Sequence, residues 1–223
     1  MIEHYVHHKQ HVNEDALTSL VFGTMSHLPD RHRVAFLECL TEGLKDLDPM
    51  ASPLPELGKD ASIELWPSYD VGTEEWQTVF GRGKKKHVIE PDVVISSGNA
   101  LVFVEAEWSK AIDEEQLFQQ YLIGRREADE RRFHLLMIGP SLIRPASPID
   151  HIQMRAKRLK ESVPDDEFGA TYTWMGWRAW HPILEGLKRA FPGDEVLAAM
   201  VTEIRRLFNH ICQNVVVWPV YNF

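Results

Sequence analysis

The segment IEPDVVISSGNALVFVEAEWSK, residues 89–110, constrains the fold more strongly than any other part of the chain. It contains two runs of apolar, strand-forming residues separated by SSGN, a sequence typical of a tight turn. We therefore predict that residues 86–96 and 100–107 pair as an antiparallel hairpin. Burying this apolar surface beside acidic residues is costly unless the acids face water or share a cation. The acids are Glu90, Asp92, Glu105 and Glu107.

The register of the hairpin decides whether these acids meet. A two-residue loop at 97–98 places Asp92 opposite Phe103 and Glu90 opposite Glu105. Because side chains alternate between the faces of a strand, the four acids then share one face at the open end of the hairpin. Like charges placed opposite each other destabilise a sheet, so this arrangement predicts either wide solvation or a divalent ion. Oxygen ligands without a nearby cysteine suit Mg²⁺ or Mn²⁺ better than Zn²⁺.

Apolar spacing and breaker residues predict the elements around the hairpin. In sequence order they are helices 13–28 and 31–47, strands SIELWP, HVIEPDVVI and ALVFVEAEW, a helix over about 113–132, and strand RFHLLMIG. Beyond Pro145 we predict a helix to Lys160, a short strand ATYTWM, and helices near 181–190 and 193–211. The predicted fold class is α/β, a mixed β-sheet flanked by helices with a helical C-terminal extension.

Length and composition favour a globular protein of ordinary type. The 223 residues, 44% of them hydrophobic, are enough for one domain, 1–223, with a substantial core. The longest apolar runs have five to seven residues and the N-terminus has no signal-peptide core, so we expect a cytoplasmic protein that does not enter the membrane. Cys39 and Cys212 predict neither a disulfide nor a zinc site. The net charge of −9 argues against coating nucleic acid, but leaves local basic segments at 81–87, 124–132 and 155–160.

The acidic hairpin and the helix after it resemble the PD-(D/E)XK, or restriction-endonuclease-like, nuclease superfamily. The resemblance rests on an apolar strand carrying Pro91-Asp92, a turn, a second strand ending in Glu105-Ala106-Glu107, and a helix bearing Gln116. Together these residues are more specific than any one of them.

The family core has the order α-β-β-β-α-β, which the resemblance assigns to about residues 13–140, leaving 141–223 as the C-terminal extension. Glu14 matches the acidic residue that many members place on the first helix against the metal site. Gln116 resembles the glutamine that several branches carry on the helix after the catalytic strand, and Tyr121 is a weaker match to a nearby aromatic residue.

The resemblance implies an enzyme, a divalent-metal-dependent endonuclease that hydrolyses the phosphodiester bonds of nucleic acid. DNA is the favoured substrate, in defence or in nucleic-acid processing. Asp92, Glu105 and the backbone carbonyl of Ala106 would bind the Mg²⁺ or Mn²⁺ ion, with Glu14 nearby. Phosphoryl transfer needs mainly positioning and charge neutralisation, so carboxylates, a metal ion and one or two basic groups suffice.

Position 107 departs from the family pattern, because most members have lysine where this sequence has glutamate. The change removes a positive group that helps to stabilise the attacking hydroxide. Glu107 is instead a candidate second-metal ligand or general base, and Lys110 is a candidate for returning the positive charge. The alternative function is a catalytically degenerate module of the same fold for nucleic-acid binding or protein assembly, which Glu107 and the acidic net charge favour.

Other features have both a structural and a functional interpretation. Three glutamines fall at helical spacing: Gln116, Gln119 and Gln120. They form either a polar helix face or part of the site, and a role in the site is favoured for Gln116 over the other two. The tryptophans of WMGWRAWHP either stack on bases or, the favoured interpretation, close a core, and Tyr121 is assigned to the core as well. The apolar tail VVVWPVYNF predicts docking on the domain or on a second copy, as in a homodimer. The sequence leaves open whether a protein partner recruits the chain.

Overall fold

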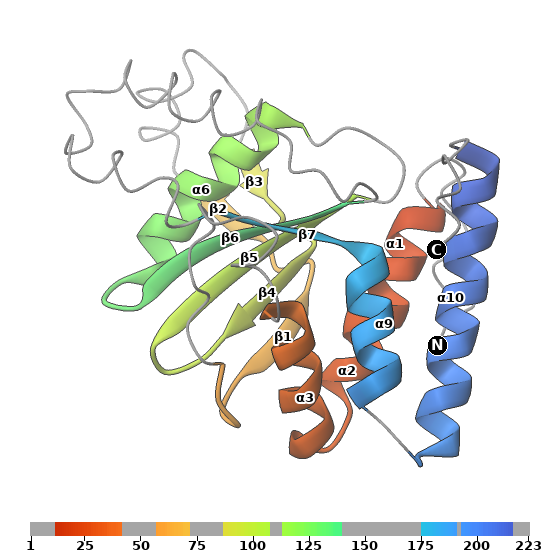
Figure 1. Ribbon diagram of the computed structural model, residues 1–223. Coiled ribbons are helices and arrows are strands. Elements are labelled where there is room, and N and C mark those ends of the chain that lie inside the picture. The colour runs from red at the N-terminus through yellow and green to blue at the C-terminus, as the bar shows by residue number, and fades with distance from the viewer. Residues whose placement is uncertain are drawn as a thin grey trace.

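The computed structural model describes residues 12–41, 57–71, 87–107, 113–139, 175–190 and 193–215. In these ranges, helices pack on both faces of a five-stranded mixed sheet, which confirms the predicted α/β class (Figure 1). The helices are α1 (Val12–Thr18), the π-helical turn η2 (Ser19–Gly23), α2 (Thr24–Ser26), α3 (Asp30–Thr41), α6 (Glu114–Ala128), α9 (Trp180–Ala190) and α10 (Glu195–Val215). The strands are β1 (Ser62–Leu65), β2 (Tyr69–Val71), β3 (His87–Ile89), β4 (Val93–Ser96), β5 (Ala100–Ala106), β6 (Arg132–Gly139) and β7 (Met175–Ala179).

The main sheet has the strand order β1-β4-β5-β6-β7. β4 pairs antiparallel with both β1 and β5, whereas β6 pairs parallel with β5 and with β7. A parallel neighbour requires a crossover connection, which α6 supplies between β5 and β6. β5 is buried along its whole length, as expected of the central strand of a sheet covered on both faces. β2 and β3 pair with each other in a separate two-stranded sheet.

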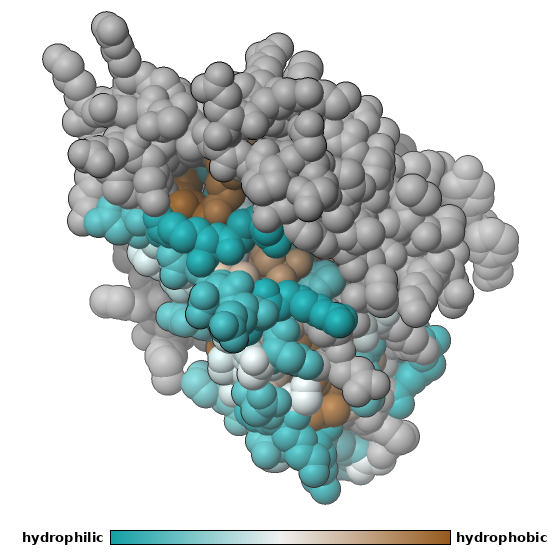
Figure 2. All heavy atoms as spheres, turned by 90° about the vertical axis from the view of Figure 1, so that its left-hand side faces the viewer, coloured by the Kyte–Doolittle hydropathy of each residue, from teal (hydrophilic) through white to brown (hydrophobic). Residues whose placement is uncertain are grey.

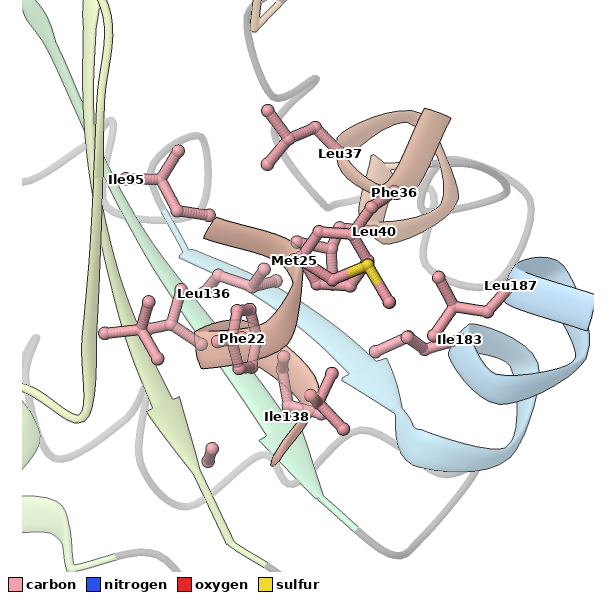
Figure 3. Close-up of a cluster of buried hydrophobic side chains, with 14 of the residues drawn as sticks. Phe22, Met25, Phe36, Leu37, Leu40, Ile95, Leu136, Ile138, Ile183 and Leu187 are labelled. Carbon is pink, nitrogen blue, oxygen red and sulfur yellow. The ribbon is translucent and has the colours of Figure 1, made fainter. Parts of the chain in front are cut away.

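One face of the main sheet is covered by helices from both ends of the described chain. α1, η2, α2, α3 and α9 contribute side chains to this core, and α10 lies outside α9 and α1 (Figure 1). Figure 3 shows Phe22 between sheet residues such as Leu136 and helix residues such as Phe36. The Phe22 ring meets Phe36 and Trp180 edge to face, with centroids 5.4 and 6.2 Å away. These contacts hold the N-terminal helices against α9.

The opposite face of the sheet is covered by α6. Leu117, Phe118 and Tyr121 on α6 are buried against Phe103 of β5, which confirms the assignment of Tyr121 to the core. Tyr69 of β2 stacks on the same phenylalanine, with ring centroids 5.2 Å apart. The small β2–β3 sheet therefore packs on the α6 side of the molecule.

Several predicted helices are confirmed within the described ranges. α1, η2 and α2 together occupy most of the predicted helix 13–28, and α3 matches the predicted helix 31–47 as far as Thr41, where the described range ends. α9 and α10 match the predicted helices near 181–190 and 193–211. None of the helices in the described ranges combines the length and the apolar character needed to cross a membrane.

The prediction of one continuous strand over 86–96 is wrong. β3 ends at Ile89 and belongs to the small sheet, while β4 begins at Val93 and belongs to the main sheet. Pro91 lies between them and accounts for the break, because proline has no N–H for a strand ladder and its ring fixes φ. The second hairpin strand, predicted to end at 107, ends at Ala106.

The hairpin loop lies one residue further along the chain than predicted. The Ser97 N–H donates to the Ala100 carbonyl at 2.9 Å, so the loop consists of Gly98 and Asn99. Asp60 accounts for this choice, since its carboxylate accepts the Gly98 N–H at 2.9 Å from outside the hairpin. Moving the loop by one residue moves every pairing partner by two positions, so the same side chains still share a face.

Two further boundaries differ from the predictions. α6 ends at Ala128, short of the predicted end at 132, because the chain turns at Asp129, where φ is 54°, and Arg132 already begins β6. The strand predicted over ATYTWM lies, except for Met175, outside the described residues. The described strand β7 begins at Met175 and joins the main sheet. The extension was predicted to be mainly helical with one short strand, and its described part adds the strand β7 to the main sheet as well as two helices.

Some predicted features lie wholly or almost wholly outside the described residues: the helix ending at 160, the C-terminal tail, Trp174, and the basic segments 81–87 and 155–160. Trp177 and Trp180, in contrast, are buried, which confirms that they pack in the core. The third basic segment, 124–132, lies where α6 ends and β6 begins. The described residues that are visible on that side are mostly hydrophilic, with small apolar areas between them (Figure 2).

Candidate functional site

Glu105 is a buried carboxylate on β5, the central strand of the main sheet. It is near the end of β5, on the face that α6 covers, and only 3% of its surface is exposed. Each of its carboxylate oxygens accepts a hydrogen bond from an α6 amide. Gln116 Nε2 donates to Oε1 at 2.8 Å, and Gln120 Nε2 donates to Oε2 at 2.5 Å. Helix and strand thus meet through a polar contact inside an otherwise apolar interface.

Asp92 lies beside Glu105. Val93 pairs with Val104, so the next pair along the same ladder sets Asp92 opposite Glu105, where Phe103 was predicted. The Asp92 Oδ2 accepts the Ala106 N–H at 2.8 Å, which ties the carboxylate to the end of β5. These contacts bring two acidic side chains together at the open end of the hairpin, as the alternation of faces predicted.

The backbone of Asp92 is held as well. Its carbonyl accepts the Trp66 N–H at 3.1 Å, directly after β1. Trp66 has a φ of 48°, a left-handed conformation that is unusual for a bulky residue, and it precedes Pro67. A strained backbone of this kind persists only where the surrounding structure enforces it.

Asp113 fixes where α6 begins, and so fixes which residues face Glu105. Its carboxylate caps the helix by accepting the N–H groups of Glu115 at 2.9 Å and Gln116 at 3.0 Å. With the first turn set in this way, Gln116 and Gln120, one helical turn apart, lie on the same face. The cap also leaves another carboxylate near the site.

The electrostatics of this cluster disfavour ionised Glu105. Burial, and next the charge of Asp92, raise the pKa of Glu105 well above its usual range. The hydrogen bond from Gln120 opposes this shift, whereas Glu107 and Asp113 add to it. Within the described part of the chain, no Lys, Arg or His side chain forms an ion pair with Glu105. A bound cation would therefore favour the charged form that the protein alone disfavours.

Glu107 follows β5 and is anchored through its backbone. Its N–H donates to the Ile138 carbonyl at 2.8 Å, and its own carbonyl accepts the Trp180 indole N–H at 3.0 Å. One carboxylate oxygen, Oε2, is buried. The backbone contacts link the Glu-x-Glu segment to β6 and to α9, so residues from far along the chain support this end of the sheet.

The predicted site residues fall into two groups. Asp92, Glu105, Ala106, Glu107 and Gln116 lie around the end of β5, as the contacts above show. The backbone of Glu14 lies in α1, but its side chain is outside the described residues, and so is the whole of Lys110. Both therefore stay predictions.

Glu90 was predicted to lie with the other hairpin acids, and this prediction is wrong. It lies in the connection between β3 and β4, is exposed, and accepts a hydrogen bond from Ser68 Oγ at 3.0 Å. The break at Pro91 removed it from the strand whose alternation placed it on the shared face.

Gln120 is the site residue that the sequence interpretation undervalued. It is fully buried and contacts Glu105, although only Gln116 was assigned to the site. The signal was its spacing of four residues from Gln116, which puts both amides on one helix face. A second undervalued feature is Trp180, predicted as core, which also holds the Glu107 carbonyl.

The basic segment 124–132 lies at the opposite end of the sheet from Glu105. Arg131 Nη1 donates to Ser96 Oγ, 2.6 Å away, at the closed end of the hairpin, and Nη2 donates to the Glu127 carbonyl at 2.8 Å. Arg126 pairs with Glu127 and also donates to the Asp70 carbonyl. These arginines connect α6 to neighbouring elements.

The described residues contain no group of three or more His, Cys, Asp or Glu side chains arranged to hold a metal ion. The part of the cluster that the structure describes in detail is a facing pair, Asp92 and Glu105, with Glu107 and Asp113 close enough to affect the pKa of Glu105. Comparisons of the chain with protein-family models, with curated proteins and with solved structures each found no match.

Proposed function

We propose that the protein is a divalent-metal-dependent nuclease that hydrolyses phosphodiester bonds, with DNA as the favoured substrate and Asp92 and Glu105 at its centre. The observation that carries the proposal is the burial of Glu105 opposite Asp92 at the end of the central strand. Glu105 is buried beside a second carboxylate and, within the described residues, forms no ion pair with a Lys, Arg or His side chain. Burying an acid in this way destabilises a fold, so its presence calls for a function. Binding a cation is the simplest one.

The arrangement of the elements supports the same proposal. A helical segment, three antiparallel strands, a helix and a parallel strand follow one another as α1–α3, β1, β4, β5, α6 and β6. This is the α-β-β-β-α-β order that the resemblance to the PD-(D/E)XK superfamily implies, with the β2–β3 pair inserted between the first two strands. In the proposed core, Asp92 directly precedes β4 and Glu105 lies near the end of β5, which supports the assignment of these two acids to the metal site.

The donor set suits a hard divalent ion. Carboxylates and a backbone carbonyl are the ligands that Mg²⁺ and Mn²⁺ prefer, and the described site offers no thiol or imidazole. Asp92, Glu105 and the carbonyl of Ala106 would hold the ion, with Glu14 and Glu107 as further candidates. When bound, it would polarise a phosphodiester and lower the pKa of a water molecule.

The side chains of the chain itself would perform the remaining tasks. Ionised Glu107 would accept a proton from the attacking water, as a general base. Gln116, half-buried at the start of α6, would position this water or a phosphate oxygen through its amide. Lys110 would supply the positive charge that lysine provides at position 107 in most of the family.

The decisive experiment incubates purified protein with plasmid, linear DNA and RNA in Mg²⁺ and in Mn²⁺, and compares the wild type with Asp92→Asn and Glu105→Gln. We expect metal-supported cleavage by the wild type and near-complete loss in both variants, since each removes a ligand charge. Glu130→Gln, which neutralises an exposed acid at the other end of α6, serves as the control and should cleave normally. Equal cleavage by all four proteins would assign the activity to a contaminant.

Substitutions of Glu107 distinguish an active site from one that has lost its activity. If Glu107 is a ligand or base, Glu107→Ala loses nearly all cleavage. If the site has decayed, the wild type is inert and Glu107→Lys restores activity by returning the family's positive group. We expect the first result, because so many neighbouring carboxylates are tolerated mainly where a cation or a proton offsets their charge.

The second candidate is a catalytically degenerate module of the same fold that binds nucleic acid or assembles with a protein partner or a second copy. It is favoured by the absence, in the described residues, of a metal-ready group of three, and by the two amides that already satisfy Glu105. A wild-type protein that binds no Mn²⁺ in calorimetry and cuts no nucleic acid, but retains nucleic acid or a partner, would establish this function.

A further inference from the structure

The two glutamines that contact Glu105 differ in their depth in the protein. Gln116 is partly exposed in the first turn of α6, beside the Asp113 cap. Gln120, one turn further along, is fully buried among core residues such as Leu117 and Tyr121. The Glu105 carboxylate therefore has one oxygen bonded toward the entrance of α6 and the other bonded toward the core.

The two carboxylate oxygens of Glu105 therefore differ in how easily their hydrogen bonds can be replaced. Oε1 accepts its hydrogen bond from Gln116, whose side chain is partly exposed and so is less confined by packing. Oε2 accepts its hydrogen bond from Gln120, at 2.5 Å, and Gln120 is fully buried, so close packing restricts the movement of its side chain. On this difference in burial, we expect the Oε1 contact to exchange more readily than the Oε2 contact.

We propose that Gln120 is a positioning residue that locks Glu105 so that it presents Oε1 alone to a cation, whereas Gln116 is the donor that a cation displaces. This inference rests on the proposed function, because it assigns the glutamines their roles toward the same metal ion. It reverses the order of importance expected from the sequence for metal binding, since the deeper and less accessible glutamine controls the ligand geometry.

The roles predict that the two substitutions affect the Mn²⁺ affinity differently. Gln120→Met keeps the length of the side chain but removes the donor, so Glu105 loses its fixed orientation. Loss of a group that orients a metal ligand typically weakens binding by about 10- to 100-fold, and we expect a loss in this range. Gln116→Met removes a competitor for Oε1, so its affinity for Mn²⁺ should equal or exceed that of the wild type, even where cleavage is impaired.

The matched control is Gln119→Met, on the same helix, because Gln119 is partly exposed and makes no hydrogen bond to Glu105. Isothermal titration with Mn²⁺ gives the affinities, and the electron paramagnetic resonance spectrum of bound Mn²⁺ reports the symmetry of its ligands. We expect an altered spectrum for Gln120→Met and an unaltered one for Gln119→Met. A thermal melt verifies that each variant is folded, and Gln120→Leu replaces Gln120→Met if that variant does not fold.

Each outcome decides the inference. Equal losses of affinity in Gln116→Met and Gln120→Met would overturn it, since a purely structural role treats the two hydrogen bonds alike. Unchanged affinity in Gln120→Met would overturn it as well. If the wild type binds Mn²⁺ but cuts no nucleic acid, the proposed nuclease function fails, while a loss of Mn²⁺ affinity in Gln120→Met but not in Gln116→Met still supports the role of Gln120. If the wild type binds no Mn²⁺, both proposals fail.

Discussion

Burial of His134 in the sheet should make the protein sensitive to mild acid. His134 lies on β6, paired with Val102 of β5, and is 5% exposed. Burial, and next the charge of Arg132, lower its pKa from 6.5 to about 4. Between these two pKa values, His134 is protonated in the unfolded chain but neutral in the folded protein. Stability falls as pH decreases through this window, because protons favour the unfolded state.

The magnitude follows from the two pKa values. One pKa unit corresponds to about 1.36 kcal/mol, so the full difference amounts to about 3 kcal/mol of stability lost between neutral pH and about pH 4. At about pH 5, roughly 2 kcal/mol of this loss is already present. His134→Leu removes the titrating group and keeps the site apolar, so its stability should depend less on pH by these amounts.

Urea denaturation of the wild type and His134→Leu at a series of pH values between about 5 and 7 provides the measurement. Subtracting one curve from the other cancels the titration of all groups that the two proteins share, including Glu105. Val102→Ala is the control, since it opens a cavity next to His134 and should cost the same free energy at every pH. A difference between the wild type and His134→Leu that stays constant over this range would refute the reasoning.

Three further substitutions test other parts of the structure by urea denaturation. Glu105→Gln should raise stability at neutral pH in metal-free buffer, because the folded protein raises the pKa of Glu105 and resists its ionisation; equal or lower stability would contradict this. Trp66→Gly should be about 1 kcal/mol more stable than Trp66→Ala, since φ is 48° there; at an ordinary strand position alanine is the more stable. Gly124→Ala should cost about 1–3 kcal/mol despite better helix propensity, because its Cβ would overlap the Phe133 ring, and a gain would show that the ring moves aside.

The sequence determined the elements and the faces of the hairpin. Apolar spacing located the helices that became α1–α3, α6, α9 and α10, and the alternation of side chains put Asp92 and Glu105 on one face. This result survived an error in the loop position, because a shift of one residue at the loop changes the partners by two positions. Periodicity is a local property, so it can be read without knowing the rest of the fold.

Tertiary structure decided the partners. Pro91 was visible in the sequence, but only the pairing with β2 shows that β3 leaves the main sheet, and only the contact from Asp60 sets the hairpin loop at Gly98. Likewise, β7 joins the sheet beside β6 after a long stretch of chain. These choices depend on residues far apart in sequence, whose contacts no local pattern encodes.

The candidate site divides in the same way. The residue types and spacing of Asp92 and Glu105 were sufficient to propose a cation site, to which the family resemblance added Gln116. The burial of Gln120, the capping of α6 by Asp113 and the contact of Trp180 with Glu107 arise only when α6 and α9 pack on the sheet. A polar residue at helical spacing has the same sequence signature on a solvated face as in a buried network. Packing distinguishes them, because it decides whether water or the Glu105 carboxylate receives the hydrogen bond.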